Sequence, residues 1–173
     1  RQMCIRDRYT TTGILDSKFG FAIDTGDAEE AILEAIESSN IDLKGVHFHL
    51  GSPIFEIEPY EVAVDLVLRF VHRFSDKFTL EEFSPGGGFA IAYTRNDNPP
   101  QIQEYAEAIV TTMRNTCSDL KIDLPKLIIE PGRSIIGPAG VALYTVGAIK
   151  DIPGVRKYVS VDGGMGDNIR PAL

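Results

Sequence analysis

Short apolar segments that end at a glycine or a proline recur along this chain, and they constrain its fold more than any other feature. Residues 43–50, 80–83 and 126–129 are rich in apolar or β-forming side chains, and a loop with Gly or Pro follows each of them. Helix-like segments lie between these stretches. This alternation is the repeat of a parallel sheet or barrel. The sequence therefore predicts an α/β protein, and residues 19–24 are interpreted as part of one further unit.

Chain length decides how much of a barrel can be present. A closed (β/α)8 barrel needs about 250 residues, whereas this chain has 173. The pattern also changes after residue 140, because residues 141–150 and 155–162 favour strands without a helix between them. These strands are expected to pair antiparallel. We therefore predict the C-terminal half of a partial (β/α)8 TIM-like barrel at residues 9–140 and the start of a C-terminal β-domain at residues 141–173.

Three segments have the sequence features of helices. Asp27 and Glu30 have the spacing of a capping box at the start of a helix over residues 28–38. Prolines at 59 and at 99–100 mark the start of two more helices, because proline is tolerated in a first helical turn. Apolar residues recur along both helices and are expected to face the core: Val62, Leu66, Phe70 and Phe74, then Ile102, Ala106, Ile109 and Met113.

The ends of the chain and its composition narrow the class of protein. Residues 1–8 are half charged and have no apolar run, so they are interpreted as a non-native leader, and the chain as a fragment. The formal charge of −8 argues against nucleic acid as a partner, and no apolar run is long enough to cross a membrane. Cys4 and Cys117 are too few for a disulfide scaffold, so a cytoplasmic location is expected.

Residues suited to ligand binding or catalysis follow the predicted strands. The run of three glycines at 86–88 exposes backbone N–H groups without a Cβ, which suits a phosphate and is also typical of a tight turn. His47 and His49 point to the same side of a strand, where one of them can cover a flat ring, and Ser52 can bind a phosphate oxygen. Two half-buried structural histidines are the alternative. A metal site is not predicted, because no third ligand has a suitable spacing.

An acid and a base lie three residues apart after the third predicted strand. Glu130 and Arg133 belong to the segment Glu-Pro-Gly-Arg-Ser. A glutamate at the end of a buried strand is costly unless it is paired. The two side chains either form a salt bridge with each other or bind separate partners. In the second case Glu130 binds a protonated ring nitrogen, and Arg133 binds a carboxylate or a phosphate.

Together, a ring-covering histidine, a phosphate loop and a strand-end glutamate suggest pyridoxal phosphate as one ligand. With these motifs the chain resembles the family of fold-type III, pyridoxal-phosphate-dependent amino-acid decarboxylases. The matching segments occur in the family's order: Asp16-Ser17-Lys18-Phe19-Gly20, Gly45-Val46-His47-Phe48-His49-Leu50-Gly51-Ser52, Gly86-Gly87-Gly88-Phe89, Glu130-Pro131-Gly132-Arg133-Ser134, and Val161-Asp162-Gly163-Gly164-Met165 through Arg170-Pro171-Ala172-Leu173.

The resemblance implies a role for each cofactor-site residue. By this resemblance His49 stacks on the cofactor ring, and Ser52, the glycines at 86–88 and the Gly132 backbone hold the phosphate. Glu130 faces the pyridine nitrogen and keeps it protonated, so that the ring is an electron sink for the charge left by CO2 loss.

The resemblance also bears on the substrate. It implies that Arg133, which also contributes to the cofactor site, and Arg170 bind carboxylates of an amino acid. After Arg133 the chain has Ser134-Ile135-Ile136, where ornithine decarboxylases usually have an aromatic residue. This favours the members that convert meso-2,6-diaminopimelate to L-lysine and CO2. An ornithine- or arginine-type decarboxylase and a non-catalytic homologue that binds a partner enzyme are the alternatives.

Two catalytic groups of the family are not matched in this chain. None of its lysines stands in the Tyr-x-x-Lys-Ala context of the family's Schiff-base lysine, and the family's acid–base cysteine belongs to a later segment. The chain alone is therefore expected to be inactive. The complete parent enzyme is expected to form a homodimer, with no nucleic-acid or membrane partner.

Overall fold

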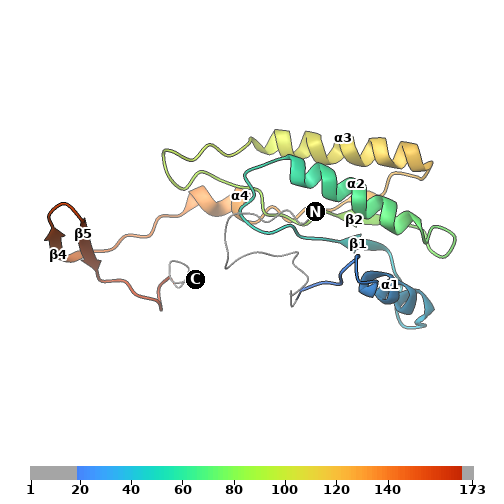
Figure 1. Ribbon diagram of the computed structural model, residues 1–173, viewed down its shortest axis with the longest axis horizontal. Coiled ribbons are helices and arrows are strands. Elements are labelled where there is room, and N and C mark those ends of the chain that lie inside the picture. The colour runs from blue at the N-terminus through green and yellow to red at the C-terminus, as the bar shows by residue number, and fades with distance from the viewer. Residues whose placement is uncertain (1–18, 169–173) are drawn as a thin grey trace. The chain divides into compact units, whose positions relative to one another are not determined.

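The computed structural model describes residues 19–168 (Figure 1). The chain divides between Pro138 and Ala139 into two compact units, which are described separately. Residues 1–8, which we interpret as a leader, and Arg170 lie outside the described residues. Within residues 19–168, no helix is long and apolar enough to span a membrane.

A three-stranded parallel sheet forms the centre of the first unit. Its strands are β1 (Gly45–His47), β2 (Glu82–Ser84) and β3 (Lys126–Leu127), in the order β1-β2-β3. The helix α2 (Glu58–His72) connects β1 to β2, and α3 (Ile102–Leu120) connects β2 to β3. Figure 1 shows α2 and α3 side by side along the strands. The predicted α/β repeat is confirmed, because parallel neighbours need such helical crossovers.

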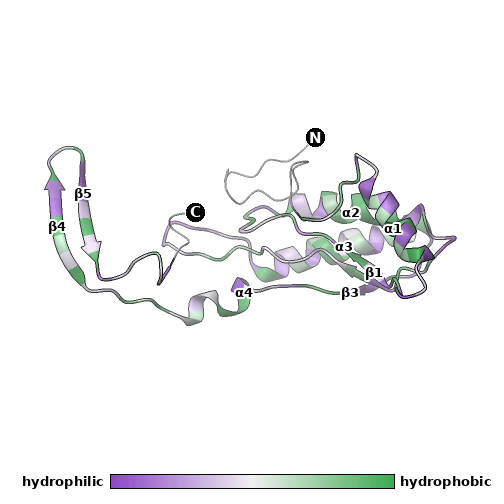
Figure 2. Cartoon of the chain, turned by 90° about the horizontal axis from the view of Figure 1, so that it is seen from below, coloured by the Kyte–Doolittle hydropathy of each residue, from purple (hydrophilic) through white to green (hydrophobic). Residues whose placement is uncertain are grey.

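The core lies between this sheet and the two helices. The Tyr60 and Phe89 rings stack with centroids 5.5 Å apart, and Tyr105 meets Tyr60 edge to face at 5.6 Å. Apolar side chains from both helices and from the segment between β1 and α2 complete the cluster: Ile54, Val64, Leu68, Ile109 and Met113. A second cluster packs α1 (Asp27–Glu37) against the end of α2 through Ile32 and Phe74. The helices accordingly have purple and green sides in Figure 2.

The predicted core stripe of α2 is wrong at its first half. Val62 and Leu66 are 48% and 50% exposed, whereas Phe70 and Phe74 are 8% and 4% exposed. With 3.6 residues per turn, a step of four residues drifts by about 40° around the helix. Two such steps carry the stripe from exposed Val62 to buried Phe70 within α2. The stripe of α3 is also exposed at its start, because Ile102, the first residue of the helix, is 45% exposed and Met113 only 2%.

Two local predictions near the N-terminal side are also corrected. Residues 19–24 form bends and a turn instead of a strand. The expected capping box is absent at α1, whose N-cap is Gly26 with a φ of 90° and no side-chain hydrogen bond. A reciprocal capping box is present at α3 instead, where the Gln101 N–H donates to Glu104 Oε2 over 2.6 Å.

The second unit contains an antiparallel hairpin, as the sequence predicts. Its strands are β4 (Val146–Ile152) and β5 (Arg156–Val161). Gly154 in the turn between them has a φ of 76°, which is readily adopted by glycine. Before this unit, the first unit ends with the short helix α4 (Arg133–Ile136) and a 3-10 turn, Gly137–Ala139, at the boundary. That the hairpin begins a C-terminal β-domain stays a prediction.

Candidate active site at the strand ends

The parallel register brings three segments together at the carboxyl ends of the strands. His47 of β1 is level with Ser84 of β2, and Gly87 forms a parallel bridge with Glu130. The Phe48 N–H donates to the Ser84 carbonyl over 2.9 Å. Beyond the strands, the Glu130 N–H donates to the Gly86 carbonyl over 2.8 Å. All three candidate segments therefore meet at one edge of the sheet, which is where α/β folds place their ligands.

The glycine loop is closely packed by backbone from both sides. A Cβ at Gly87 would overlap the carbonyl of Glu130, and one at Gly88 would overlap the carbonyl of Gly51. Gly86 and Gly88 also have φ values of +72° and +92°. Gly86 and Gly88 therefore need glycine for their backbone conformation, and all three positions need it because a side chain would overlap neighbouring backbone. Their backbone is thereby held in one arrangement.

A buried tyrosine anchors this loop from the core. The Tyr60 hydroxyl donates to the Gly87 carbonyl over 2.7 Å, and the Tyr60 side chain is fully buried. Burial, with a smaller contribution from Tyr105, raises the pKa of Tyr60 above its ordinary value. The hydroxyl therefore stays protonated and keeps donating. No sequence pattern marks Tyr60, because it precedes Gly87 by 27 positions and stands among the apolar residues of α2.

The two histidines take different partners. His47 Nε2 lies 3.3 Å from Glu130 Oε2, and both side chains are about half exposed. His49 Nδ1 lies 3.5 Å from the Gly87 backbone nitrogen and accepts a hydrogen bond from its N–H. Burial lowers the pKa of His49, His47 lowers it further, and Glu130 opposes them. His49 is therefore held as a neutral, flat ring beside the glycine loop.

Ser52 lies next to the same loop. Its neighbour Gly51 faces Gly88 through its carbonyl, and the Ile54 N–H donates to the Gly88 carbonyl over 2.9 Å. Two segments therefore fix the chain on either side of Ser52. The other predicted phosphate contact, Gly132, turns the chain just after Glu130 with a φ of 49°.

Glu130 and Arg133 have different partners in the structure. Arg133 Nη1 donates to the hydroxyl of Tyr93 over 2.7 Å, and the guanidinium lies 5.8 Å from the centroid of that ring. Glu130 is paired with His47 instead. The geometry thus favours separate roles over a mutual salt bridge. Tyr93 is a second residue that no sequence pattern marks, because it precedes its partner Arg133 by 40 positions.

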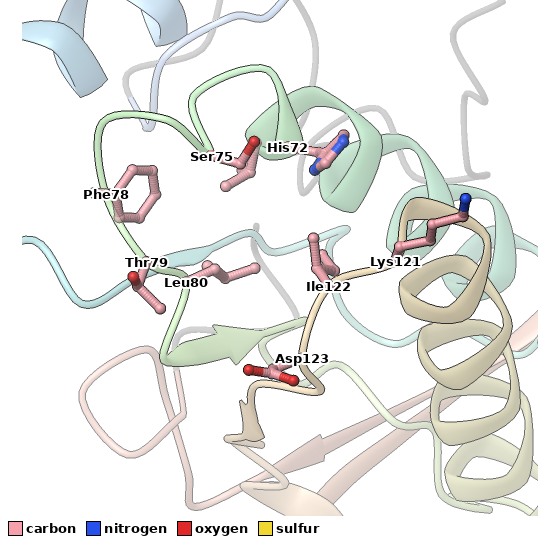
Figure 3. Close-up of a pocket in the computed structure, with 9 residues that line it drawn as sticks. His72, Ser75, Phe78, Thr79, Leu80, Lys121, Ile122 and Asp123 are labelled. Carbon is pink, nitrogen blue, oxygen red and sulfur yellow. The ribbon is translucent and has the colours of Figure 1, made fainter.

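A hollow of about 250 Å³ lies elsewhere in the first unit (Figure 3). Its walls come from the end of α2, the segment before β2 and the segment before β3, so it adjoins the amino ends of the strands. None of the candidate residues lines it. The lining residues are Val71, His72, Ser75, Phe78, Thr79, Leu80, Lys121, Ile122 and Asp123.

Comparison with known proteins identifies related sequences. Residues 4–137 match the family model described as pyridoxal-dependent decarboxylase, pyridoxal binding domain. The diaminopimelate decarboxylase of Bacillus subtilis (strain 168) is 46% identical over 167 residues, which cover 95% of this chain and 38% of that protein.

Solved structures of similar fold agree with this. The diaminopimelate decarboxylase of M. jannaschii, in complex with L-lysine, has a TM-score of 0.80 and 37% identity, over 91% of this chain and 36% of that one. The enzyme from Helicobacter pylori, also complexed with L-lysine, has a TM-score of 0.78 and 30% identity, over 96% of this chain and 39% of that one. The chain thus spans between 36% and 39% of the length of these relatives.

Proposed function

Because the chain belongs to the pyridoxal-dependent decarboxylase family, we propose that it supplies most of the cofactor site of a diaminopimelate decarboxylase. The reaction is the conversion of meso-2,6-diaminopimelate to L-lysine and CO2. One observation carries the proposal: His49, the glycine loop and Glu130, far apart in sequence, meet at the carboxyl edge of one parallel sheet. We place residues 9–140 in the C-terminal half of a (β/α)8 barrel and residues 141–173 at the start of a β-domain.

The residues at this edge fit pyridoxal phosphate. Backbone N–H groups of the glycine loop, which carries no side chains, are suited to bind a phosphate. Ser52 stands beside it with a hydroxyl, and the Gly132 backbone lies just after Glu130 at the neighbouring strand end. We assign the phosphate to these three groups. The neutral His49 ring next to the loop is suited to stack on a flat pyridine ring.

Glu130 is the residue that we assign to the protonated nitrogen of the cofactor ring. When bound, pyridoxal phosphate supplies an electron-withdrawing ring that stabilises the negative charge left by the departing CO2. Glu130 is an acid at the strand end, and it accepts a hydrogen bond from a protonated ring nitrogen. His47 holds the carboxylate of Glu130 from the other side at 3.3 Å. This contact restricts the position of the Glu130 carboxylate.

Arg133 and Arg170 bind carboxylate groups of the substrate in this proposal, and Arg133 also borders the cofactor. The guanidinium of Arg133 donates to the hydroxyl of Tyr93, and Glu130 is paired with His47. This leaves its charge available to a substrate instead of being neutralised within the Glu-Pro-Gly-Arg segment. We further propose a homodimer for the complete protein, as the family resemblance implies.

The test uses the complete gene product that carries this chain, loaded with pyridoxal phosphate. Release of CO2 is measured from meso-diaminopimelate, L-ornithine and L-arginine. We expect a kcat/KM for diaminopimelate that exceeds the other two by at least about a hundredfold, because a site that pairs a second carboxylate rejects substrates without one. A preference for ornithine or arginine would overturn the substrate assignment. Cofactor binding without CO2 release from any of them would favour the non-catalytic homologue.

A further inference from the structure

Two interactions join Tyr93 to Arg133. The Tyr93 hydroxyl accepts a hydrogen bond of 2.7 Å from Arg133 Nη1, and the ring lies 5.8 Å from the guanidinium carbon. The Tyr93 ring is 63% exposed, so the contact lies at the surface of the first unit. A pair this exposed adds little to folding stability. Its main consequence is the position of a long, flexible arginine side chain.

The loop that carries Tyr93 is itself fixed. Asp97 Oδ2 accepts hydrogen bonds from the Tyr93 N–H at 2.9 Å and from the Thr94 N–H at 2.8 Å. The Asp97 N–H donates back to the Thr94 carbonyl over 3.2 Å. These bonds close a tight turn directly at Tyr93, and the N–H groups of Thr94 and Tyr93 lower the pKa of Asp97. The backbone of Tyr93 is therefore held in place.

The same loop also contacts the element that carries Arg133. A Cβ at Gly137, just after α4, would overlap Ile91 Cδ1. The start of the loop thus lies against the end of the short helix whose first residue is Arg133. The segments that carry Tyr93 and Arg133 are therefore in contact at two points. One contact is between Ile91 and Gly137, and the other is between the side chains of Tyr93 and Arg133.

We propose that Tyr93 is a positioning residue for Arg133 and thereby a determinant of specificity for a substrate with a second carboxylate. This rests on the substrate role proposed above for Arg133. A guanidinium has five N–H donors, so the one given to Tyr93 leaves a fork for a carboxylate. Holding the side chain in advance lowers the entropy that substrate binding would otherwise cost.

The experiment compares Tyr93→Phe, Arg133→Ala and the double variant in the complete gene product. Two quantities are measured: KM for meso-diaminopimelate, and the inhibition constant of D-lysine, which keeps the reacting amino-acid end and lacks the second carboxylate. We expect Tyr93→Phe to raise KM by about threefold to tenfold, the value of one hydrogen bond, with kcat and the lysine constant unchanged. The KM of the double variant should equal that of Arg133→Ala, because Tyr93→Phe has no further effect once the Arg133 side chain is gone.

Two further variants make the result decisive. Asp97→Ala loosens the turn and should raise KM in the same direction as Tyr93→Phe. Tyr105→Phe removes a buried hydrogen bond of 2.6 Å to the Ile54 carbonyl, and it should lower stability without separating the two ligands. An unchanged KM in Tyr93→Phe, while Arg133→Ala raises it, would overturn the role of Tyr93 alone. If Arg133→Ala weakened the binding of both ligands equally, the substrate role of Arg133 would be refuted, and the inference with it.

Discussion

His47 Nε2 and Glu130 Oε2 lie 3.3 Å apart, although His47 belongs to β1 and Glu130 follows β3, and these two strands are not neighbours in the sheet. The strand between them is β2, and the glycine loop follows it. A Cβ at Gly86 would lie 2.6 Å from the Phe48 carbonyl oxygen, 2.9 Å from His49 Nδ1 and 3.4 Å from His47 Nε2. The absence of a side chain at Gly86 thus provides the room in which the histidines lie beside the loop.

Gly86→Ala should therefore disturb the site beyond its backbone strain. Gly20 is the matched control, because its φ of +70° is close to the +72° of Gly86 and nothing lies within 4 Å of its Cβ position. Both alanine variants should lose about 1–2 kcal/mol from a left-handed backbone. Only Gly86→Ala should also weaken pyridoxal phosphate binding, by at least about tenfold. Equal cofactor affinities in the two variants, measured by titration, would show that the room at Gly86 is not needed.

Tyr60 predicts a sensitivity to alkaline pH. Burial raises its pKa in the folded state, so the unfolded chain loses this proton first, beginning near the ordinary tyrosine pKa of about 10. The free energy of unfolding should therefore fall as the pH rises above about 10. Tyr60→Phe should be less stable at neutral pH by about 1–3 kcal/mol, since the buried Gly87 carbonyl loses its donor. Its stability should also fall less steeply above pH 10 than that of the unchanged protein. Denaturant titrations across this range would detect identical slopes, which would argue against the assignment.

His49 predicts the opposite sensitivity on the acidic side. Its pKa is lowered in the folded state, mainly by burial, so the unfolded chain takes up this proton first as the pH falls below about 6.5. The stabilisation is complete above that pH and is lost progressively below it. His49→Gln should therefore weaken the fall in stability between about pH 6.5 and 5. An NMR titration that places the His49 pKa above the ordinary histidine value would contradict this account.

Sequence patterns located the strand ends well but the side-chain partners poorly. The strands and their parallel order follow from apolar runs and intervening helices, and the strand-end rule placed His49 and Glu130 at one edge. The helix faces were less predictable, because a stripe spaced by four residues drifts around α2 from exposed Val62 to buried Phe70. The capping box at α3 was missed because its N-cap is Gln101, which is not among the favoured capping residues.

Contacts between distant segments left no pattern in the sequence. Tyr60 reaches Gly87 from a helix face that is otherwise apolar, and Tyr93 meets Arg133 across 40 positions. Both contacts depend on how α2, the loop after β2 and α4 pack in three dimensions. They could be found only once these elements were in place.

The turnover number of Glu130→Gln tests the central claim most directly. It is measured as CO2 released from saturating meso-diaminopimelate by the complete gene product with saturating pyridoxal phosphate. Glu82→Gln is the matched control, because Glu82 also forms an exposed ion pair, with Lys126 at 3.1 Å, but at the start of β2. The loss of a charged hydrogen bond should lower the kcat of Glu130→Gln by roughly tenfold or more, and Glu82→Gln should keep the original kcat. A Glu130→Gln variant with undiminished kcat would contradict the assignment of Glu130 to the cofactor.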